Sequence, residues 1–309
     1  MRNRDCHDVL IVGGGPAGLS AALLLGRCLR RVVLCDARQP RNAASRAMHG
    51  YLGHDGIPPD DFLELARSQL NPYETVCQIR GRVSEVTRDA NKFTMSCENE
   101  TYTARAVLLA TGLVDRLPEI PGVEQFYGKT LHHCPYCDAW EHRGQRIGVL
   151  GSDAAAIELA LELVLWSPQV TLFTQGTKVS EPLSLERLQA AGVRLVEDRP
   201  VALDGQGSLL SGVRTRGGLH PCDALFFSPQ QVQRSPLAER LGCEVDDTGC
   251  VIDSNSDGTT GQQGLFIAGN ASKGIQMAII AAAEGLKAGA TINNWLLERD
   301  RLALTVTHT

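Results

Sequence analysis

The stretch that decides the fold is residues 8–18, DVLIVGGGPAG, in which an apolar segment runs directly into a glycine-rich turn. The apolar run Leu19–Leu29 comes next, and Arg31–Asp36 follows it. This order predicts a strand, a tight turn, a helix and a second strand, which together make a βαβ unit. We therefore expect the chain to begin with one half of a doubly wound α/β domain.

The turn has the spacing of a dinucleotide-binding loop, GxGxxG, at Gly13, Gly15 and Gly18. The first glycine allows the tight bend, the second lets a pyrophosphate approach the backbone, and the third lets the helix pack on the strand. Asp36 ends the following strand, where an acid can accept a hydrogen bond from a ribose hydroxyl. The Pro16-Ala17 pair inside the turn favours FAD among the dinucleotides.

A second unit of the same kind starts at Arg146–Leu150 and turns through residues 151–156, GSDAAA. Asp153 stands at the second glycine position, which places a Cβ and a negative charge where a pyrophosphate would approach. Two like charges a few Å apart repel by several kcal/mol at an effective dielectric of ~20, against ~8 kcal/mol for micromolar binding. The strand Gln169–Phe173 runs on into Thr174-Gln175-Gly176, without an arginine cluster for NADP or an acid for NAD. The sequence therefore argues against NADP(H) binding here.

The two units predict an α/β fold with two doubly wound Rossmann-like domains. Proline and glycine punctuate the chain near residues 117–122, and a second break is expected near residues 242–249. An FAD domain split by an inserted NAD(P)-type domain follows from this arrangement. Its predicted parts are residues 1–115 and 246–309 for the FAD domain, and residues 116–245 for the insertion.

The inserted segment carries residues 132–138, HHCPYCD, midway between the two turns. A CxxC in this place predicts a dithiol, Cys134 and Cys137, that exchanges electrons with a flavin. Proline suits the first position of a helix, so Cys134 would lie at a helix N-terminus, where partial positive charge lowers a thiol pKa. Asp138 could move a proton if burial raised its pKa, and His132 or His133 could serve in acid–base chemistry or in packing. A zinc half-site and an inert thiol pair are the alternatives, and the other eight cysteines are expected to be unpaired.

These motifs resemble, in order and spacing, those of the low-molecular-weight thioredoxin reductases, and the resemblance covers essentially the whole chain. It implies a homodimer with tightly bound FAD, in which Cys137 faces the flavin, Cys134 exchanges with an external thiol pair and Asp138 handles protons. It also implies that residues 268–270, AGN, hold the ribityl and phosphate groups and that Gln276 lies near the pyrimidine ring. The predicted catalytic residues are Cys134, Cys137, Asp138 and His133, with no metal ligand. The predicted cofactor-binding residues are Gly13, Gly15, Pro16, Ala17, Gly18, Asp36, Asn42, His49, Val83, Thr111, Gly112, Gly269, Asn270 and Gln276.

The chain also departs from that pattern. It has Asn270 in place of an aspartate, Pro135-Tyr136 inside the CxxC, and no basic cluster for NADPH. These features resemble thioredoxin-reductase-like flavoproteins that oxidise dithiols, such as gliotoxin- and holomycin-type sulfhydryl oxidases, and the diflavin-linked disulfide oxidoreductases. We therefore expect an FAD-dependent dithiol/disulfide oxidoreductase that oxidises dithiols and is not reduced by NADPH. A second FAD near the degenerate turn, an NADPH-dependent thioredoxin reductase and a non-catalytic flavin/disulfide redox sensor remain alternatives.

The composition of the chain limits the classes of partner that it can bind. The 309 residues carry a formal net charge of −5 and a pI of about 5.9, so no basic footprint for nucleic acid is present. The longest apolar runs are too short to span a membrane, and the start of the chain lacks the pattern of a signal peptide. We expect a cytoplasmic protein whose partner is a small-molecule or protein dithiol or disulfide, without a transmembrane segment.

Overall fold

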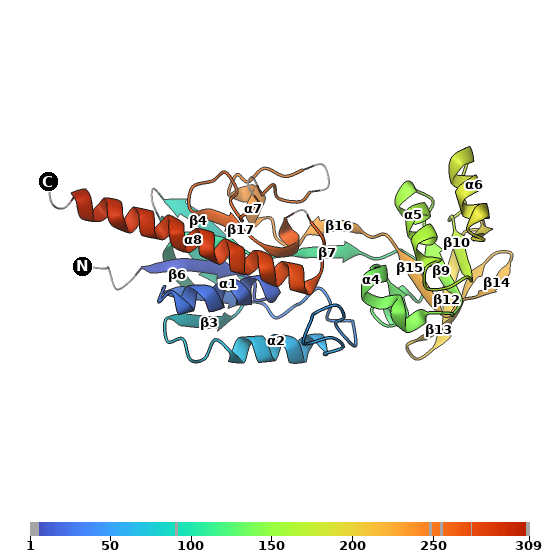
Figure 1. Ribbon diagram of the computed structural model, residues 1–309, viewed down its shortest axis with the longest axis horizontal. Coiled ribbons are helices and arrows are strands. Elements are labelled where there is room, and N and C mark those ends of the chain that lie inside the picture. Colours follow the sequence, from blue (N-terminus) through green and yellow to red (C-terminus); the bar gives the residue numbers. More distant parts are fainter. Residues whose placement is uncertain (1–5, 90–91, 247–248, 254–255, 273, 307–309) are drawn as a thin grey trace.

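The computed structural model describes residues 6–306 except 90–91, 247–248, 254–255 and 273. Part of the signal-peptide expectation rests on residues 1–5, which lie outside the described residues. The chain folds into two lobes, each built on its own sheet, with β7 and β16 running between them (Figure 1). The helices are α1 Pro16–Arg27, α2 Pro59–Ser68, α3 Val123–Phe126, α4 Pro135–Asp138, α5 Ala154–Leu163, α6 Pro182–Ala190, α7 Leu237–Arg240 and α8 Ala278–Val306, with 3-10 turns η1 Trp140–His142 and η2 Gly269–Ala271.

The first lobe is built on a seven-stranded sheet in the order β3-β2-β1-β6-β5-β4, with β17 paired to β6. The strands β1, β2, β3, β6 and β17 run parallel, whereas β4 and β5 form an antiparallel extension. Its strands are β1 His7–Val12, β2 Val32–Asp36, β3 Val76–Arg80, β4 Val83–Asp89, β5 Lys92–Cys97, β6 Glu100–Leu109 and β17 Leu265–Ile267.

Both faces of this sheet are covered. In β1, Val9 and Ile11 pack into the cluster that contains the helices α1 and α8, while Leu10 and Val12 pack into the cluster on the opposite face. Because both faces of β1 are buried, its sequence is a continuous apolar run in which apolar and polar residues do not alternate. The helix α8 crosses α1 so closely that a Cβ at Gly285 would lie 2.0 Å from the carbonyl oxygen of Ala17. That contact fixes α1, and with it the turn at its N-terminus.

The second lobe has a parallel sheet in the order β11-β10-β9-β15-β8 and a small antiparallel sheet, β12-β13-β14. The lobes are linked by an antiparallel pair, β7 and β16. The strands are β7 Leu113–Arg116, β8 Leu131–His132, β9 Ile147–Leu150, β10 Val170–Phe173, β11 Arg194–Val196, β12 Pro200–Gln206, β13 Leu209–Thr215, β14 Gly218–Pro221, β15 Ala224–Phe227 and β16 Gln230–Gln233.

The predicted α/β class and the two βαβ units are confirmed. Both helices begin earlier than the apolar runs suggested, because Pro16 occupies the first turn of α1 and Asp153 caps α5. The domain boundaries at residues 115/116 and 245/246 stay a prediction. In the described part of the chain, no helix combines the length and apolarity that crossing a membrane requires.

Candidate functional site

A cavity of about 480 Å³ lies where the first dinucleotide turn faces the dithiol loop of the second lobe. It is lined by all four predicted catalytic residues and by every predicted cofactor-binding residue except Gly18. Gly18 lies behind the wall, where a Cβ would come within 1.9 Å of the carbonyl oxygen of Gly13. Its place matches the packing role expected of the third glycine.

The N-terminus of α1 opens onto this cavity and fits a pyrophosphate. Its N-cap residue, Gly15, has no side chain with which to cap the helix, and the first turn contains no acid. A Cβ built on Gly15 would meet nothing within 4 Å, so the space beside the turn is open. The free N–H groups and the positive end of the helix dipole suit an anionic diphosphate.

Asp36, at the cavity, and Glu284, which contacts the cavity residue Gly269, have partners that the sequence did not reveal. Asp36 accepts hydrogen bonds from the Arg67 guanidinium at 3.1 Å and from the backbone N–H of Arg38 at 3.1 Å. Glu284 of α8 accepts from the backbone N–H of Gly269 at 2.9 Å, and burial raises the pKa of its carboxyl group. The Asp36 carboxylate at the predicted ribose position is therefore held in a fixed direction, and Glu284 holds the backbone at the predicted ribityl position.

The dithiol loop lies on the other side of the cavity. Cys134 and Cys137 are joined in a disulfide. Cys134 is the N-cap of the short helix α4, and Pro135 occupies its first turn, as the sequence predicted. Tyr136, between the cysteines, is 69% exposed and packs edge-on against Trp166. The Cys134–Cys137 disulfide thus lines the cavity, while the Tyr136 side chain between the two cysteines lies at the protein surface.

The two adjacent histidines have different partners. His133 lies at the cavity, and its Nε2 is 3.4 Å from the Arg41 guanidinium. Burial lowers the pKa of His133, against the opposing effect of Asp115, so the neutral imidazole is favoured near pH 7. His132 is buried, and its Nδ1 lies 3.2 Å from Oδ1 of Asp138.

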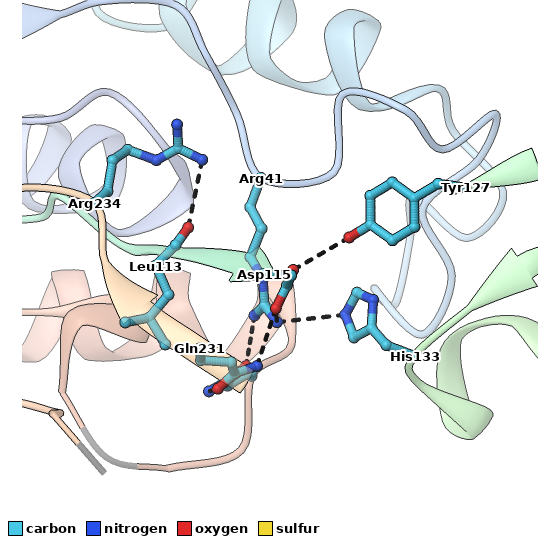
Figure 2. A network of polar contacts seen from close by, with 8 residues as sticks. Arg41, Leu113, Asp115, Tyr127, His133, Gln231 and Arg234 are labelled. Carbon is cyan, nitrogen blue, oxygen red and sulfur yellow. Dashed lines mark hydrogen bonds and ion pairs between the residues drawn. The ribbon is translucent and has the colours of Figure 1, made fainter. Parts of the chain in front are cut away.

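Arg41 is the centre of a polar network that joins both lobes to the linking strands (Figure 2). It donates to both carboxylate oxygens of Asp115 on β7, at 2.7 and 2.6 Å, and to Oε1 of Gln276 at 2.5 Å. Gln231 on β16 and Tyr127 of the second lobe also donate to the Asp115 carboxylate, both at 3.2 Å. The Asp115 side chain is only 2% exposed. Burial raises its pKa, but the Arg41 guanidinium outweighs burial and holds the pKa below its usual value.

Replacing Arg41 with methionine is expected to lower the free energy of unfolding at pH 7 by ~3 kcal/mol, because it leaves the Asp115 carboxylate buried without a cation. Since the native pKa of Asp115 is depressed, the pair stabilises the fold above the ordinary carboxyl pKa, and this contribution is lost as the pH falls through the native pKa. Denaturant unfolding measured at several pH values should therefore show that the loss of unfolding free energy in Arg41→Met becomes smaller in acid. Arg214→Met, which breaks the exposed pair with Asp204, is the control and should change stability by ~1 kcal/mol or less. An equal penalty in both variants would contradict this account of Asp115.

The second turn faces a different pocket. The Asp153 side chain accepts a hydrogen bond at 2.9 Å from the backbone N–H of Ala156, so it caps α5. The sequence expectation of no arginine cluster needs correction, because the fold brings Arg116 and Arg199 to this pocket from outside the unit. Glu119 lines the same pocket. The positive charges of the two arginines are thus balanced by the negative charges of Asp153 and Glu119 in the same pocket.

Comparison with known proteins finds matches over most of the chain. Residues 7–285 match the family model described as "Pyridine nucleotide-disulphide oxidoreductase". Thioredoxin reductase tcpT of Claviceps purpurea is 32% identical over 315 residues, covering 96% of each chain. A protein of Arthroderma benhamiae named "Probable thioredoxin reductase" is 36% identical over 181 residues, which cover 56% of this chain and 45% of that one. The crystal structure of HlmI superimposes with a TM-score of 0.94 at 34% identity, covering 99% of this chain and 98% of that one.

Proposed function

The chain belongs to the pyridine nucleotide-disulphide oxidoreductase family as a thioredoxin reductase-like, flavin-dependent disulfide oxidoreductase, and we propose that it oxidises dithiols and is not reduced by NADPH. The observation that carries this proposal is the Asp153 carboxylate on the N-terminus of α5. A dithiol would enter at the Cys134–Cys137 pair, and its electrons would leave the bound flavin for an external acceptor such as oxygen or a quinone.

The two helix N-termini support this direction by their contrast. At α1 the first N–H groups have no capping side chain, and the space beside Gly15 is open. At α5 the Asp153 carboxylate accepts the hydrogen bond of Ala156 that a pyrophosphate would otherwise take. A nicotinamide dinucleotide would have to displace this carboxylate or remain beside it, and two anions a few Å apart repel.

We propose that FAD lies in the first cavity and is held by the predicted residues that line it. When bound, FAD supplies the group that accepts two electrons and one proton from the dithiol pair. A substrate thiolate attacks Sγ of Cys134, which breaks the Cys134–Cys137 disulfide and leaves Cys137 as a thiolate. The second substrate thiol then attacks the mixed disulfide, forming the substrate disulfide and freeing Cys134. Neutral His133 lies at the cavity to take the proton of an attacking thiol.

Anaerobic rapid mixing of the flavin-loaded protein tests the direction of electron flow. Dithiothreitol should bleach the visible flavin absorbance at a rate that supports turnover, whereas NADPH and NADH should leave it unchanged over the same time. Bleaching by NADPH at a turnover-competent rate would contradict the proposal. The protein would then be an NADPH-dependent thioredoxin reductase, as the names of its relatives suggest.

Substitutions at Asp153 are expected to separate charge from helix capping. Asp153→Gly removes the Cβ and the charge, and should raise NADPH affinity by about tenfold or more, which is ~1.4 kcal/mol. Asp153→Asn keeps a good N-cap but removes the charge, so it should give part of this gain. Both variants should change thermal stability little, since glycine and asparagine are tolerated at an N-cap. The measurement is NADPH binding by isothermal titration calorimetry, which needs no flavin reduction, and an unchanged affinity in both variants would show that Asp153 does not exclude the nucleotide.

We further propose a homodimer as the working form and keep one FAD per subunit as the expected stoichiometry. Flavin released from denatured protein, measured against protein concentration, checks this number. A value of two flavins per subunit would instead favour a second FAD near the degenerate turn.

A further inference from the structure

A line of buried polar contacts leads from the dithiol loop to the surface of the second lobe. His132 bridges Asp138 and His142, with its Nδ1 3.2 Å from Oδ1 of Asp138 and its Nε2 3.0 Å from Nε2 of His142. Nδ1 of His142 lies 2.9 Å from Oε1 of Gln145. The two histidines are 5% and 8% exposed, whereas Gln145 is exposed. The four side chains thus form one continuous chain from the cavity to solvent.

The chemistry of the outer end fixes where the protons lie. In the amide orientation of this structure, Oε1 of Gln145 can only accept, so Nδ1 of His142 carries a proton. Burial lowers the pKa of His142, which favours the neutral ring, and its Nε2 is then the acceptor for an N–H of His132. Nδ1 of His132 and the Asp138 carboxyl group are close enough for a hydrogen bond, so a proton that reaches either group can pass to the other. Each contact along the line therefore joins atoms that can exchange a proton through a hydrogen bond.

The surroundings hold this line in place. The ring of Phe226 lies 5.4 Å from the His132 ring and 6.4 Å from the His142 ring, measured between centroids. The main chain of Gln145 is fixed twice, because its N–H donates to the carbonyl of His142 and its carbonyl accepts from the Ser167 hydroxyl. The charged groups facing His142 are Asp138, Glu141 and Asp223, and acidic neighbours stabilise a proton in transit.

We propose that Asp138, His132 and His142 form a proton pathway from the dithiol site toward the surface, with His132 and His142 as the relay residues. Gln145 is a positioning residue that holds the His142 ring at the surface end, where water takes the proton. Oxidation of a dithiol to a disulfide releases two electrons and two protons. A bound flavin would take both electrons and one proton, so one proton would remain and would have to leave. Asp138 is 21% exposed and lines the cavity, and the histidine line gives it a second connection, which leads away from the cavity toward the surface of the second lobe. The inference rests on the redox role of the cysteine pair but not on the direction of electron flow, because the reverse reaction takes up the same proton.

His142→Phe and His142→Gln test the pathway, with His220→Gln on β14 as the control. The rate of anaerobic flavin bleaching by dithiothreitol is measured in H2O and D2O, with increasing imidazole buffer. Both His142 variants should bleach ~100-fold more slowly, show a larger solvent isotope effect than wild type, and recover part of the rate as imidazole rises. Flavin content and melting temperature report whether each variant is folded. If His142→Phe loses flavin, the pathway is tested with His142→Gln, which keeps a hydrogen-bonding side chain.

A wild-type bleaching rate in a flavin-loaded His142 variant would overturn the pathway. A slow rate without an isotope effect or imidazole rescue would also overturn it, since it would mark a structural role. Failure of the proposed function is distinguishable: wild-type flavin would then be bleached by NADPH and not by dithiothreitol. The same comparison would be run with NADPH as reductant and an aromatic disulfide as acceptor.

Discussion

Replacing Cys137 with serine is expected to abolish dithiol oxidation, with turnover falling roughly 10³-fold or more to the background of free flavin. A hydroxyl group can neither re-form the disulfide with Cys134 nor pass electrons onward. Loss of thiol, measured with a colorimetric thiol reagent under steady-state conditions, reports this directly. Flavin content should be unchanged, because Cys137 belongs to the dithiol loop and not to the dinucleotide turn.

Cys28→Ser is the matched control, since Cys28 is an exposed, unpaired cysteine at the end of α1. It should retain full turnover. If Cys137→Ser kept the wild-type rate while Cys28→Ser behaved normally, the disulfide would not be in the electron path. The non-catalytic redox sensor would then be the better description of the protein.

Gly15→Val is expected to yield a folded protein that has lost its flavin, with affinity reduced at least ~100-fold, or ~2.7 kcal/mol. The backbone of Gly15 is extended, with φ −76° and ψ −175°, so a β-branched residue fits without strain. A Cβ there meets no protein atom within 4 Å, and the added methyl groups would occupy only the space assigned to the pyrophosphate.

Gly18→Ala provides the contrast, because its Cβ would lie 1.9 Å from the carbonyl oxygen of Gly13. It should lower the melting temperature as well as the flavin content. Flavin content by absorbance and thermal unfolding by circular dichroism separate the two effects. A Gly15→Val protein with full flavin content would show that the cofactor does not lie against this turn.

The sequence predicted the fold well because its decisive signals are local. A buried strand, three glycines at fixed spacing and a following helix all lie within residues 8–29, and the structure places the turn at the cavity. The second turn was interpreted less completely. Asp153 stands directly before a helical run, where aspartate is a preferred N-cap. The capping hydrogen bond from Ala156 to Asp153 therefore has a local signal in the sequence. The prediction for this turn used only the negative charge of Asp153.

The parts of the site that the sequence did not predict depend on contacts between distant segments. Arg41 and Asp115 are 74 positions apart, and Arg116 and Arg199 approach the second turn from outside its βαβ unit. No periodicity or spacing in the sequence encodes such pairs. The difference between His132 and His133 had a local signal, since successive side chains near a strand end point to opposite sides. His132 belongs to β8 and turns toward Asp138, whereas His133 meets Arg41.

The most direct test of the central claim is an anaerobic titration of the flavin-loaded protein with dithiothreitol, followed by the visible absorbance of the flavin. The first equivalent per subunit should open the Cys134–Cys137 disulfide, and the second should bleach the flavin. The Cys137→Ser variant should keep its flavin oxidised, and NADPH should leave the wild-type flavin unchanged. Flavin that resists excess dithiol but bleaches with one equivalent of NADPH would contradict the account.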